Sequence, residues 1–310
     1  MAILYVDDGG SDTSPYDTRA KAANLLETAL ADAACVAGST VYVKSDHVEA
    51  NRVQNVILGS AHGVATNPIT IISCDFAHEP PEAGDFETMT IGGGSIDTTD
   101  GAFDISLSGW DIWIGLEFIV GDDLNVALEA SRDVRLINCK IIVDDLIVAG
   151  ALNSSSVNKA AYFENVAVEQ VTLGRISINA SLFWRGGSYR FNGGSVDPNL
   201  FSFYSASGGD LIVEDVDIQD LNAGDYLVND IVGAHTVLIK RCKIPAACNY
   251  MNTGPHYGGG KVRFHSVDDG NFIHKFYEWY FEGEIIEDIA VYRSATYDGT
   301  NEYSRANSGL

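Results

Sequence analysis

An eight-residue pattern recurs along much of this chain and restricts what the chain can fold into. Seven windows share it: 111–118 (DIWIGLEF), 134–141 (VRLINCKI), 161–168 (AYFENVAV), 189–196 (YRFNGGSV), 211–218 (LIVEDVDI), 237–244 (VLIKRCKI) and 262–269 (VRFHSVDD). Their spacing of about 25 residues is typical of solenoids, in which each repeat is one coil. The pattern therefore favours a stack of similar coils over a sandwich.

Three positions of each window indicate how a coil is built. The third position is apolar throughout: Trp113, Leu136, Phe163, Phe191, Val213, Ile239 and Phe264. The sixth is apolar or small: Leu116, Cys139, Val166, Gly194, Val216, Cys242 and Val267. Both positions are expected to face inward, which requires a bend between them because side chains of a straight strand alternate. The fifth position supplies mostly residues that tolerate a left-handed backbone: Gly115, Asn138, Asn165, Gly193, Asp215, Arg241 and Ser266. Strand, corner, strand and a longer return segment predict one coil of a parallel β-helix.

Further strands and one helix complete the expected coils. Apolar runs bounded by turn residues follow the windows at 124–128, 146–149, 176–178, 201–204 and 226–228. Upstream, residues 69–76, 89–96 and 103–107 are interpreted as earlier, less regular coils. Residues 18–34, rich in Ala and Leu and followed by Gly38, predict a helix. Because a solenoid exposes the apolar end of its first coil, we expect this helix to cap that end.

Length, charge and cysteine content narrow the class of protein. The 310 residues show no Pro-rich or charge-rich linker, so we divide them into a strand with a capping helix (1–40), the coils (41–270) and an aromatic-rich terminal coil with a tail (271–310). A net charge of −24, from 43 acidic and 19 basic residues, argues against nucleic-acid binding. No apolar run predicts a membrane span, and Met1 leads into a strand at 3–6 without a signal peptide. The five cysteines include no CxxC pair and are expected to be reduced and buried.

The ends of the chain resemble known families. Residues 3–12 (ILYVDDGGSD), the Ala-rich helix and residues 38–43 (GSTVYV) resemble the start of pectate-lyase-like right-handed parallel β-helix proteins. Residues 43–49 (VKSDHVE), 67–74 (NPITIISC), 297–300 (YDGT) and 303–304 (YS) resemble β-helix virion proteins of tailed bacteriophages. The first resemblance implies an all-β, right-handed, single-stranded parallel β-helix with an N-terminal strand and helix cap.

The second resemblance implies a virion structural protein, and within that class we expect a capsid decoration or cement protein. Such a protein would be assembled in the host cytoplasm and would lie on the virion surface. Its partners would be further copies of itself, in a homotrimer, and the major capsid protein or other virion proteins. No cofactor is expected.

Two acidic pairs are the best candidates for chemistry. Asp122 and Asp123 are followed one coil later by Asp144 and Asp145, a spacing that would stack the pairs in adjacent coils and gather all of their carboxylates. Such a group can bind Ca²⁺ or raise the pKa of one carboxyl. The simpler interpretation is a pair of turn motifs, because Asp is favoured in turns. We favour turns, because like charges that are stacked without a cation cost stability. A second group, Glu164, Glu214 and Asp215 with Arg190 or Lys240, is expected to be a solvated face.

An alternative from another class is a tailspike-like protein that binds or depolymerises host polysaccharide, as a lyase or a hydrolase. Sugar-binding grooves need aromatic platforms flanked by carboxylates. Trp110, Trp113, Trp184 and Tyr204 are the residues to inspect for such a platform, although Trp113 is expected to face inward. We expect no polysaccharide cleavage, because no carboxylate is paired with a nearby basic residue in the predicted stack.

Aromatic residues are concentrated near the C-terminus, at Phe272, Phe276, Tyr277, Trp279, Tyr280 and Phe281. One interpretation is that they form the core of the last coil and its lid. However, they cannot all face inward if the segment is a strand. We therefore predict that some of them form the contact between subunits.

Overall fold

The protein is all-β, with strands arranged in two sheets. The computed structural model describes residues 1–50, 52–59, 62–82, 84–86, 92–126, 132–149, 160–172, 174–193, 199–203, 209–221, 225–229, 236–245, 248–251, 261–267 and 275–280. Within these ranges one sheet contains 16 strands and the other contains 8. The helices are short: η1 (Arg19–Lys21), α1 (Leu26–Ala31) and η2 (Thr99–Gly101). None of the helices in the described ranges is long and apolar enough to cross a membrane.

Three sets of strands recur in most repeats of the described residues. The main path of the larger sheet is β1 (Ile3–Val6), β2 (Thr40–Lys44), β5 (Ile69–Cys74), β8 (Asp111–Ile114), β11 (Val134–Ile137), β14 (Ala160–Gln170), β16 (Ser181–Phe191), β18 (Leu211–Glu214), β21 (Thr236–Lys240), β23 (Lys261–Val267) and β24 (Lys275–Tyr280). Beside it lie β3 (Val48–Glu49), β6 (Ser95–Asp97), β9 (Glu117–Val120), β12 (Lys140–Val143) and β19 (Asp217–Ile218). The smaller sheet contains β4 (Val56–Leu58), β7 (Ile105–Leu107), β10 (Leu124–Val126), β13 (Leu146–Ala149), β15 (Arg175–Ile178), β17 (Asn199–Phe203), β20 (Tyr226–Asn229) and β22 (Asn249–Met251).

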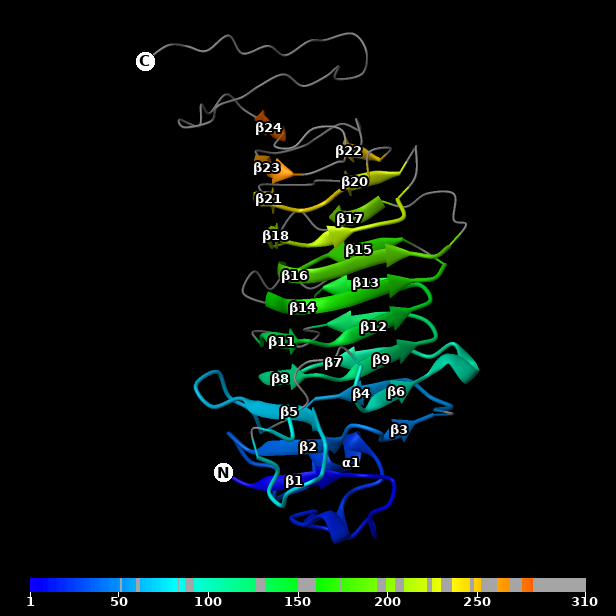
Figure 1. The fold of residues 1–310 in the computed structure, drawn as a ribbon, viewed down its shortest axis with the longest axis vertical. Coiled ribbons are helices and arrows are strands. Elements are labelled where there is room, and N and C mark those ends of the chain that lie inside the picture. Colours follow the sequence, from blue (N-terminus) through cyan, green and yellow to red (C-terminus); the bar gives the residue numbers. More distant parts are fainter. Residues whose placement is uncertain are drawn as a thin grey trace.

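Successive repeats pair in parallel and in register. Leu136 of β11, for example, lies between Trp113 of β8 and Phe163 of β14. Among the strands of the described ranges, only β23 and β24 pair antiparallel. The strands succeed one another along the longest axis of the molecule, from β1 near the N-terminus to β23 and β24 (Figure 1).

The columns predicted to face inward form the core. Trp113, Leu136, Phe163, Val213 and Ile239 are buried in the third column. Leu116, Cys139, Val166, Val216 and Cys242 are buried in the sixth. They belong to one apolar cluster that extends from Leu4 to Cys248. Strands about 4.8 Å apart bring equivalent side chains into contact, so each column is a continuous apolar ladder. All five cysteines are buried and none of them forms a disulfide, as predicted.

The predicted corner between the first two strands of a repeat is also present. Asn138, Asn165, Asp215 and Arg241 have φ of 51°, 51°, 56° and 52°, and Gly115 has φ of 74°. Asn165 donates from Nδ2 to Asn138 Oδ1 at 2.6 Å, so the two corners are also linked to each other. The left-handed conformation of Arg241 is unusual for a long side chain.

The predicted position of the fourth window is wrong. Leu182 pairs with Ala161, Trp184 with Phe163 and Tyr189 with Val168, so the window is 182–189 (LFWRGGSY) and not 189–196. The two stretches share an aromatic residue, one intervening residue and then Gly-Gly-Ser, so the pattern alone cannot separate them. Gly186 and Gly187, with φ of 71° and 94°, therefore form this corner. Phe191 is nevertheless buried.

The three upstream coils are in fact parts of a single long repeat. Ile69 of β5 pairs with Asp111 of β8, so this repeat is far longer than those that follow it. Between them, β6 pairs with β9, and β7 pairs with β10. Residues 95–97 and 105–107 are thus the second and third strands of the repeat that β5 begins. Short apolar runs do not reveal to which strand set they belong, which explains the error.

The predicted helix at 18–34 is interrupted. Ala23 donates its N–H to Tyr5 O at 2.9 Å and accepts from Asp7 N at 3.0 Å, so the chain pairs with the edge of β1 between η1 and α1. This backbone pairing overrides the high helix propensity of the Ala-rich segment. The remaining helix α1 packs against β1, β2 and β4 at the N-terminal end of the stack (Figure 1).

Candidate functional site

The acidic pairs form a cluster at the corner that leads into the smaller sheet. Asp122, Asp123 and Asp145 are half-buried, and each places a carboxylate oxygen within 4.8 Å of the others. Asp122 and Asp123 precede β10, and Asp145 precedes β13. The backbone joins the layers as well, since Asp145 donates its N–H to Asp122 O at 3.2 Å. We name Asp122, Asp123 and Asp145 the acidic corner.

Asp144 does not join the acidic corner. Leu124 pairs with Ile147, so the repeat here is one residue longer than the sequence distance from Asp122 to Asp144 that suggested the stacking. The shift of one residue places Asp145 beside Asp122 and leaves the exposed Asp144 to accept a hydrogen bond from Thr172 Oγ1 at 2.7 Å. Only three of the four predicted carboxylates therefore gather.

The surroundings of the acidic corner raise the pKa of its carboxyl groups. Burial raises the pKa of Asp123 to about 6, helped by the negative charges of Asp145, Asp122 and Asp104 and opposed by a hydrogen bond from Leu146 N. That bond is 3.0 Å long and ends at Asp123 Oδ1. The pKa of Asp122 is raised by burial and then by Asp104 and Asp144.

Two neighbours of the acidic corner were not predicted from the sequence. Asp104 precedes β7 and accepts a hydrogen bond from Asp123 N at 3.3 Å. Arg175, the first residue of β15, lowers the pKa of Asp145, which is raised overall by burial and by Asp122 and Asp144. Asp104 can be recognised as a neighbour of the acidic corner only once β7 is aligned with β10. Arg175 is distant from Asp145 in the sequence and is brought near only by the stacking of β15 on β13.

This arrangement permits two kinds of chemistry. Half-buried carboxylate oxygens within a few ångströms are ligands that Ca²⁺ prefers. Alternatively, a neutral Asp123 beside an ionised carboxylate is the combination that acid catalysis of glycoside hydrolysis requires. The same residues also serve the turns, because Asp123 accepts from Leu146 N across the layers. The turn interpretation therefore holds for the backbone, although it does not account for three like charges in contact.

The second acidic group is not assembled into a site. Glu214 pairs with Lys240 at 3.4 Å, and Asp215 pairs with Arg241 at 2.6 Å. Each of these pairs joins residues of β18 and its corner to the next repeat along the outer surface. Glu164 is an exposed residue two strands away from Glu214, and Arg190 is also exposed. Glu214 and Asp215 are thus neutralised by ion pairs, while Glu164 and Arg190 are exposed to solvent, which agrees with the solvated face that we expected.

The four candidate sugar-stacking residues lie in different environments. Trp113 and Trp184 are inside the core, at 0% and 1% exposure, so neither can contact a ligand on the surface. Tyr204 lies outside the described residues. Of the three that the structure describes, Trp110 lines a groove on the outer face of the larger sheet.

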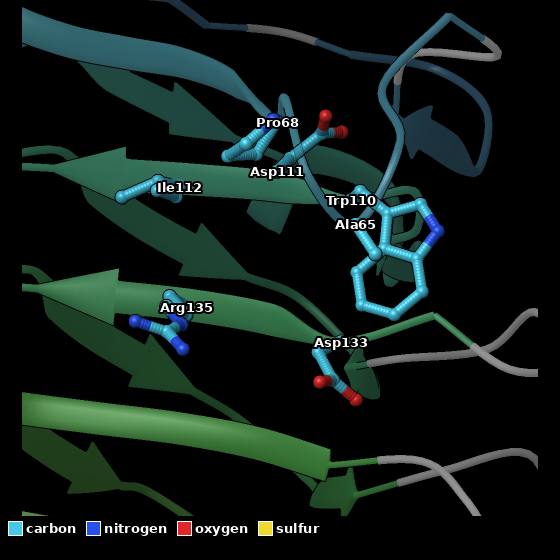
Figure 2. A pocket seen from close by; sticks show the side chains of 7 residues that line it. All are labelled: Ala65, Pro68, Trp110, Asp111, Ile112, Asp133 and Arg135. Carbon is cyan, nitrogen blue, oxygen red and sulfur yellow. The ribbon is translucent and has the colours of Figure 1, made fainter.

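The groove has a volume of about 380 Å³ and is lined by Ala65, Pro68, Trp110, Asp111, Ile112, Asp133 and Arg135. Figure 2 shows Trp110 and Asp133 at one end of the groove, and Ile112 and Arg135 further along β8 and β11. Two carboxyl groups, one guanidinium and one indole therefore share a single depression. We name these seven residues the Trp110 groove.

The predicted subunit contact cannot be placed. Phe272 and Phe281 lie outside the described residues, and the side chains of Phe276, Tyr277, Trp279 and Tyr280 do too. The backbone of β24 is described, and it pairs antiparallel with β23, with Trp279 opposite Val262. A further coil would have paired in parallel.

Comparisons with known proteins give no relative. No protein-family model, no curated protein and no solved structure matches this chain.

Proposed function

We propose that this chain forms a right-handed, single-stranded parallel β-helix and serves as a structural protein of a tailed-phage virion, most specifically as a capsid decoration or cement protein. The observation that carries the proposal is the in-register stack of three strand sets per repeat, with α1 packed at its N-terminal end. Such a stack presents a long, rigid surface whose geometry does not depend on a ligand. The resemblance of the segments at 43–49, 67–74 and 297–304 to phage virion proteins supports the same class.

The proposed partners are other copies of the chain, as a homotrimer, and the major capsid protein or another virion protein. The location is the virion surface, after assembly in the host cytoplasm. Nucleic acid is not a proposed partner, because a chain with net charge −24 would be repelled by phosphate. No membrane contact is part of the proposal.

Imaging of purified particles tests the role and location. A fusion of this chain to a small density marker should decorate the capsid at sites related by three-fold symmetry. Light scattering of the isolated protein should give three times the 33.3 kDa mass of one chain. Marker density confined to the tail, or particles that lack the chain, would contradict the decoration role.

A second candidate is a tailspike-like enzyme acting on host polysaccharide, and the acidic corner is the observation that favours it. The surroundings raise the pKa of Asp123 to about 6, and it lies beside Asp122 and Asp145, so around pH 6 a substantial fraction of Asp123 is a proton donor next to two further carboxyl groups. In this version the same oxygens are the proposed ligands of Ca²⁺. Incubation with capsular and lipopolysaccharide glycans decides between the candidates. Chain shortening that disappears in Asp123→Asn, but not in the exposed Asp46→Asn control, would establish the enzyme and reject the purely structural role.

A further inference from the structure

The Trp110 groove lies on a different surface from the acidic corner. Its strands β8 and β11 belong to the larger sheet, whereas the acidic corner precedes strands of the smaller sheet. The groove is also lined by more kinds of chemical group than the acidic corner: an aromatic ring, hydrogen-bond acceptors and a donor. We propose that the Trp110 groove is a binding site for a short neutral oligosaccharide.

Asp111 is the first observation. It aligns with Ile69 and Val134, which are fully buried apolar residues at the first position of their repeats. Asp111 is itself only 1% exposed and lies at the floor of the groove. A buried carboxyl group needs polar partners, and Asp111 has a partner within the protein. Asp111 therefore makes the floor of the groove polar, and contact with a sugar falls to the less buried Trp110, Asp133 and Arg135.

The residues above that floor are held in fixed positions. Asp133 accepts a hydrogen bond from Ala160 N at 3.0 Å, which anchors its carboxylate to the next layer. The guanidinium carbon of Arg135 lies 4.9 Å from the ring centroid of Tyr162. Tyr162 is in turn stacked on Phe183, with centroids 5.0 Å apart and ring planes at 13°. The acceptor and the donor are therefore positioned before a ligand arrives, which lowers the entropy cost of binding.

The loop on the other side of the groove is closely packed. A Cβ atom on Gly63 would lie 2.7 Å from Trp110 O, so the loop backbone approaches β8 more closely than any other residue type allows. Ile69 also donates its N–H to Trp110 O at 3.1 Å. Trp110 is consequently fixed at the rim through its backbone, and its half-buried indole lines the groove (Figure 2). An indole ring next to carboxyl and guanidinium groups suits the alternating C–H and O–H surfaces of a sugar.

Charge and size define the ligand class. Two carboxyl groups face one guanidinium in the groove, and the whole chain carries −24, so an acidic polysaccharide would be repelled. The volume of about 380 Å³ falls in the usual range of small-molecule sites and is too small for a protein domain. A neutral oligosaccharide meets both conditions. This inference is independent of the proposed virion role, because a decoration protein and an enzyme could each carry such a site.

Titration calorimetry of the full chain with four probes tests the proposal. Maltohexaose, mannohexaose and chitohexaose are the neutral probes, and hexagalacturonate is the anionic one. At least one neutral probe should bind, and hexagalacturonate should bind more weakly than that probe. Trp110→Ala and Asp133→Asn should each weaken binding about tenfold, as expected for groups at the centre of a small site.

Two control variants keep the result interpretable if a substitution disturbs folding. Trp110→Phe retains an aromatic ring and should keep most of the affinity. Arg185→Gln removes an exposed charge from the same face, two strands away from Arg135, and should leave binding unchanged. The proposal is overturned if no neutral probe binds, if hexagalacturonate binds most tightly, or if Arg185→Gln weakens binding as much as Trp110→Ala. Loss of particle attachment in Trp110→Ala without any sugar binding would identify a protein contact instead. Particle imaging and sugar titration are separate readouts, so the virion role and the groove can fail separately.

Discussion

Two corners of the repeat stack polar residues in opposite ways. At the tight corner after the first strand set, each stacked pair joins a donor to an acceptor: Asn165 to Asn138, and Arg241 to Asp215. At the acidic corner, Asp122, Asp123 and Asp145 bring three acceptors together. Repetition in register places similar residues in contact in both cases. We infer that stacked polar residues stabilise the fold where donors meet acceptors, and we expect the acidic corner to lower the free energy of unfolding.

The largest expected effect tests the geometry of the tight corner. Gly187→Ala would place a Cβ atom 2.1 Å from Val166 O, at a residue whose φ is 94°. We expect a loss of about 3 kcal/mol or more in the free energy of unfolding, since the clash is with backbone and cannot relax by rotation. Urea unfolding measures it. Gly84→Ala is the matched control, because nothing lies within 4 Å of its Cβ position. Equal stability of the two variants would show that the corner is not constrained.

The next effect concerns the Asn ladder. Asn165→Ala removes the hydrogen bond to Asn138 and leaves Ala at φ of 51°. The expected loss is about 2 kcal/mol, of which roughly half is the hydrogen bond and half the strained backbone. Asn165→Gly relieves the backbone strain but not the missing bond, so it should be less destabilising by thermal unfolding. If Asn165→Gly were less stable than Asn165→Ala, the left-handed backbone would not contribute to the loss.

At the acidic corner we expect a substitution to increase the free energy of unfolding rather than to decrease it. Asp123→Asn removes one of three like charges and keeps an oxygen that can accept from Leu146 N. We expect a gain on the order of 1 kcal/mol in unfolding free energy at pH 8, reduced from the full pKa shift because Asp123 is partly solvated. Calcium chloride should stabilise the wild type more than this variant. Destabilisation by Asp123→Asn would mean that the cluster is complementary after all.

The gain should also depend on pH. The pKa of Asp123 is raised in the folded state to about 6, so the neutral form stabilises the fold below pH 4. That contribution is lost as the pH rises through about 6. The difference in unfolding free energy between Asp123→Asn and the wild type should therefore be small at pH 4 and largest at pH 8. A constant difference across this interval would assign the effect to packing rather than to charge.

The smallest expected effect on stability is again at the tight corner. Arg241→Gln removes the guanidinium that donates from Nε and Nη2 to Asp215 at 2.7 and 2.6 Å. Both residues are substantially exposed, so the change in melting temperature should be slight and should vanish at about 1 M salt, where exposed charges are screened. If the melting temperature were still lower at high salt, Arg241 would contribute through its left-handed backbone conformation rather than through its charge.

The sequence pattern was sufficient for the stacked strands but not for every register. Columns such as Trp113, Leu136 and Phe163 were recognisable because burial demands apolar residues at the same position of each repeat. The predicted position of the fourth window is wrong because 182–189 and 189–196 share the same arrangement of aromatic, Gly and Ser residues. Only pairing with Ala161 and Phe163 selects one of them. Helix propensity alone predicts an uninterrupted helix at 18–34, whereas the backbone pairing of Ala23 with Tyr5 interrupts it.

The candidate sites depended still more on spacing. A difference of one residue between the assumed and the actual repeat moved Asp144 out of the acidic corner and brought Asp145 into contact with Asp122. The Trp110 groove combines residues from three separate segments, at 65–68, 110–112 and 133–135. Trp110 is recognisable as a candidate from the sequence, but Asp133 and Arg135 are not, because they approach it only through the alignment of β11 with β8.

The reversed direction of β24 has a consequence for growth of the sheet. A row of parallel strands can in principle be extended indefinitely, since each edge offers the template for the next copy. Because β24 runs against β23, the described strands do not continue the parallel row beyond β23. A second copy whose first strand paired with β24 would therefore join a sheet of mixed direction. A fibre that repeated the parallel pairing of this sheet from end to end would be interrupted at every such junction.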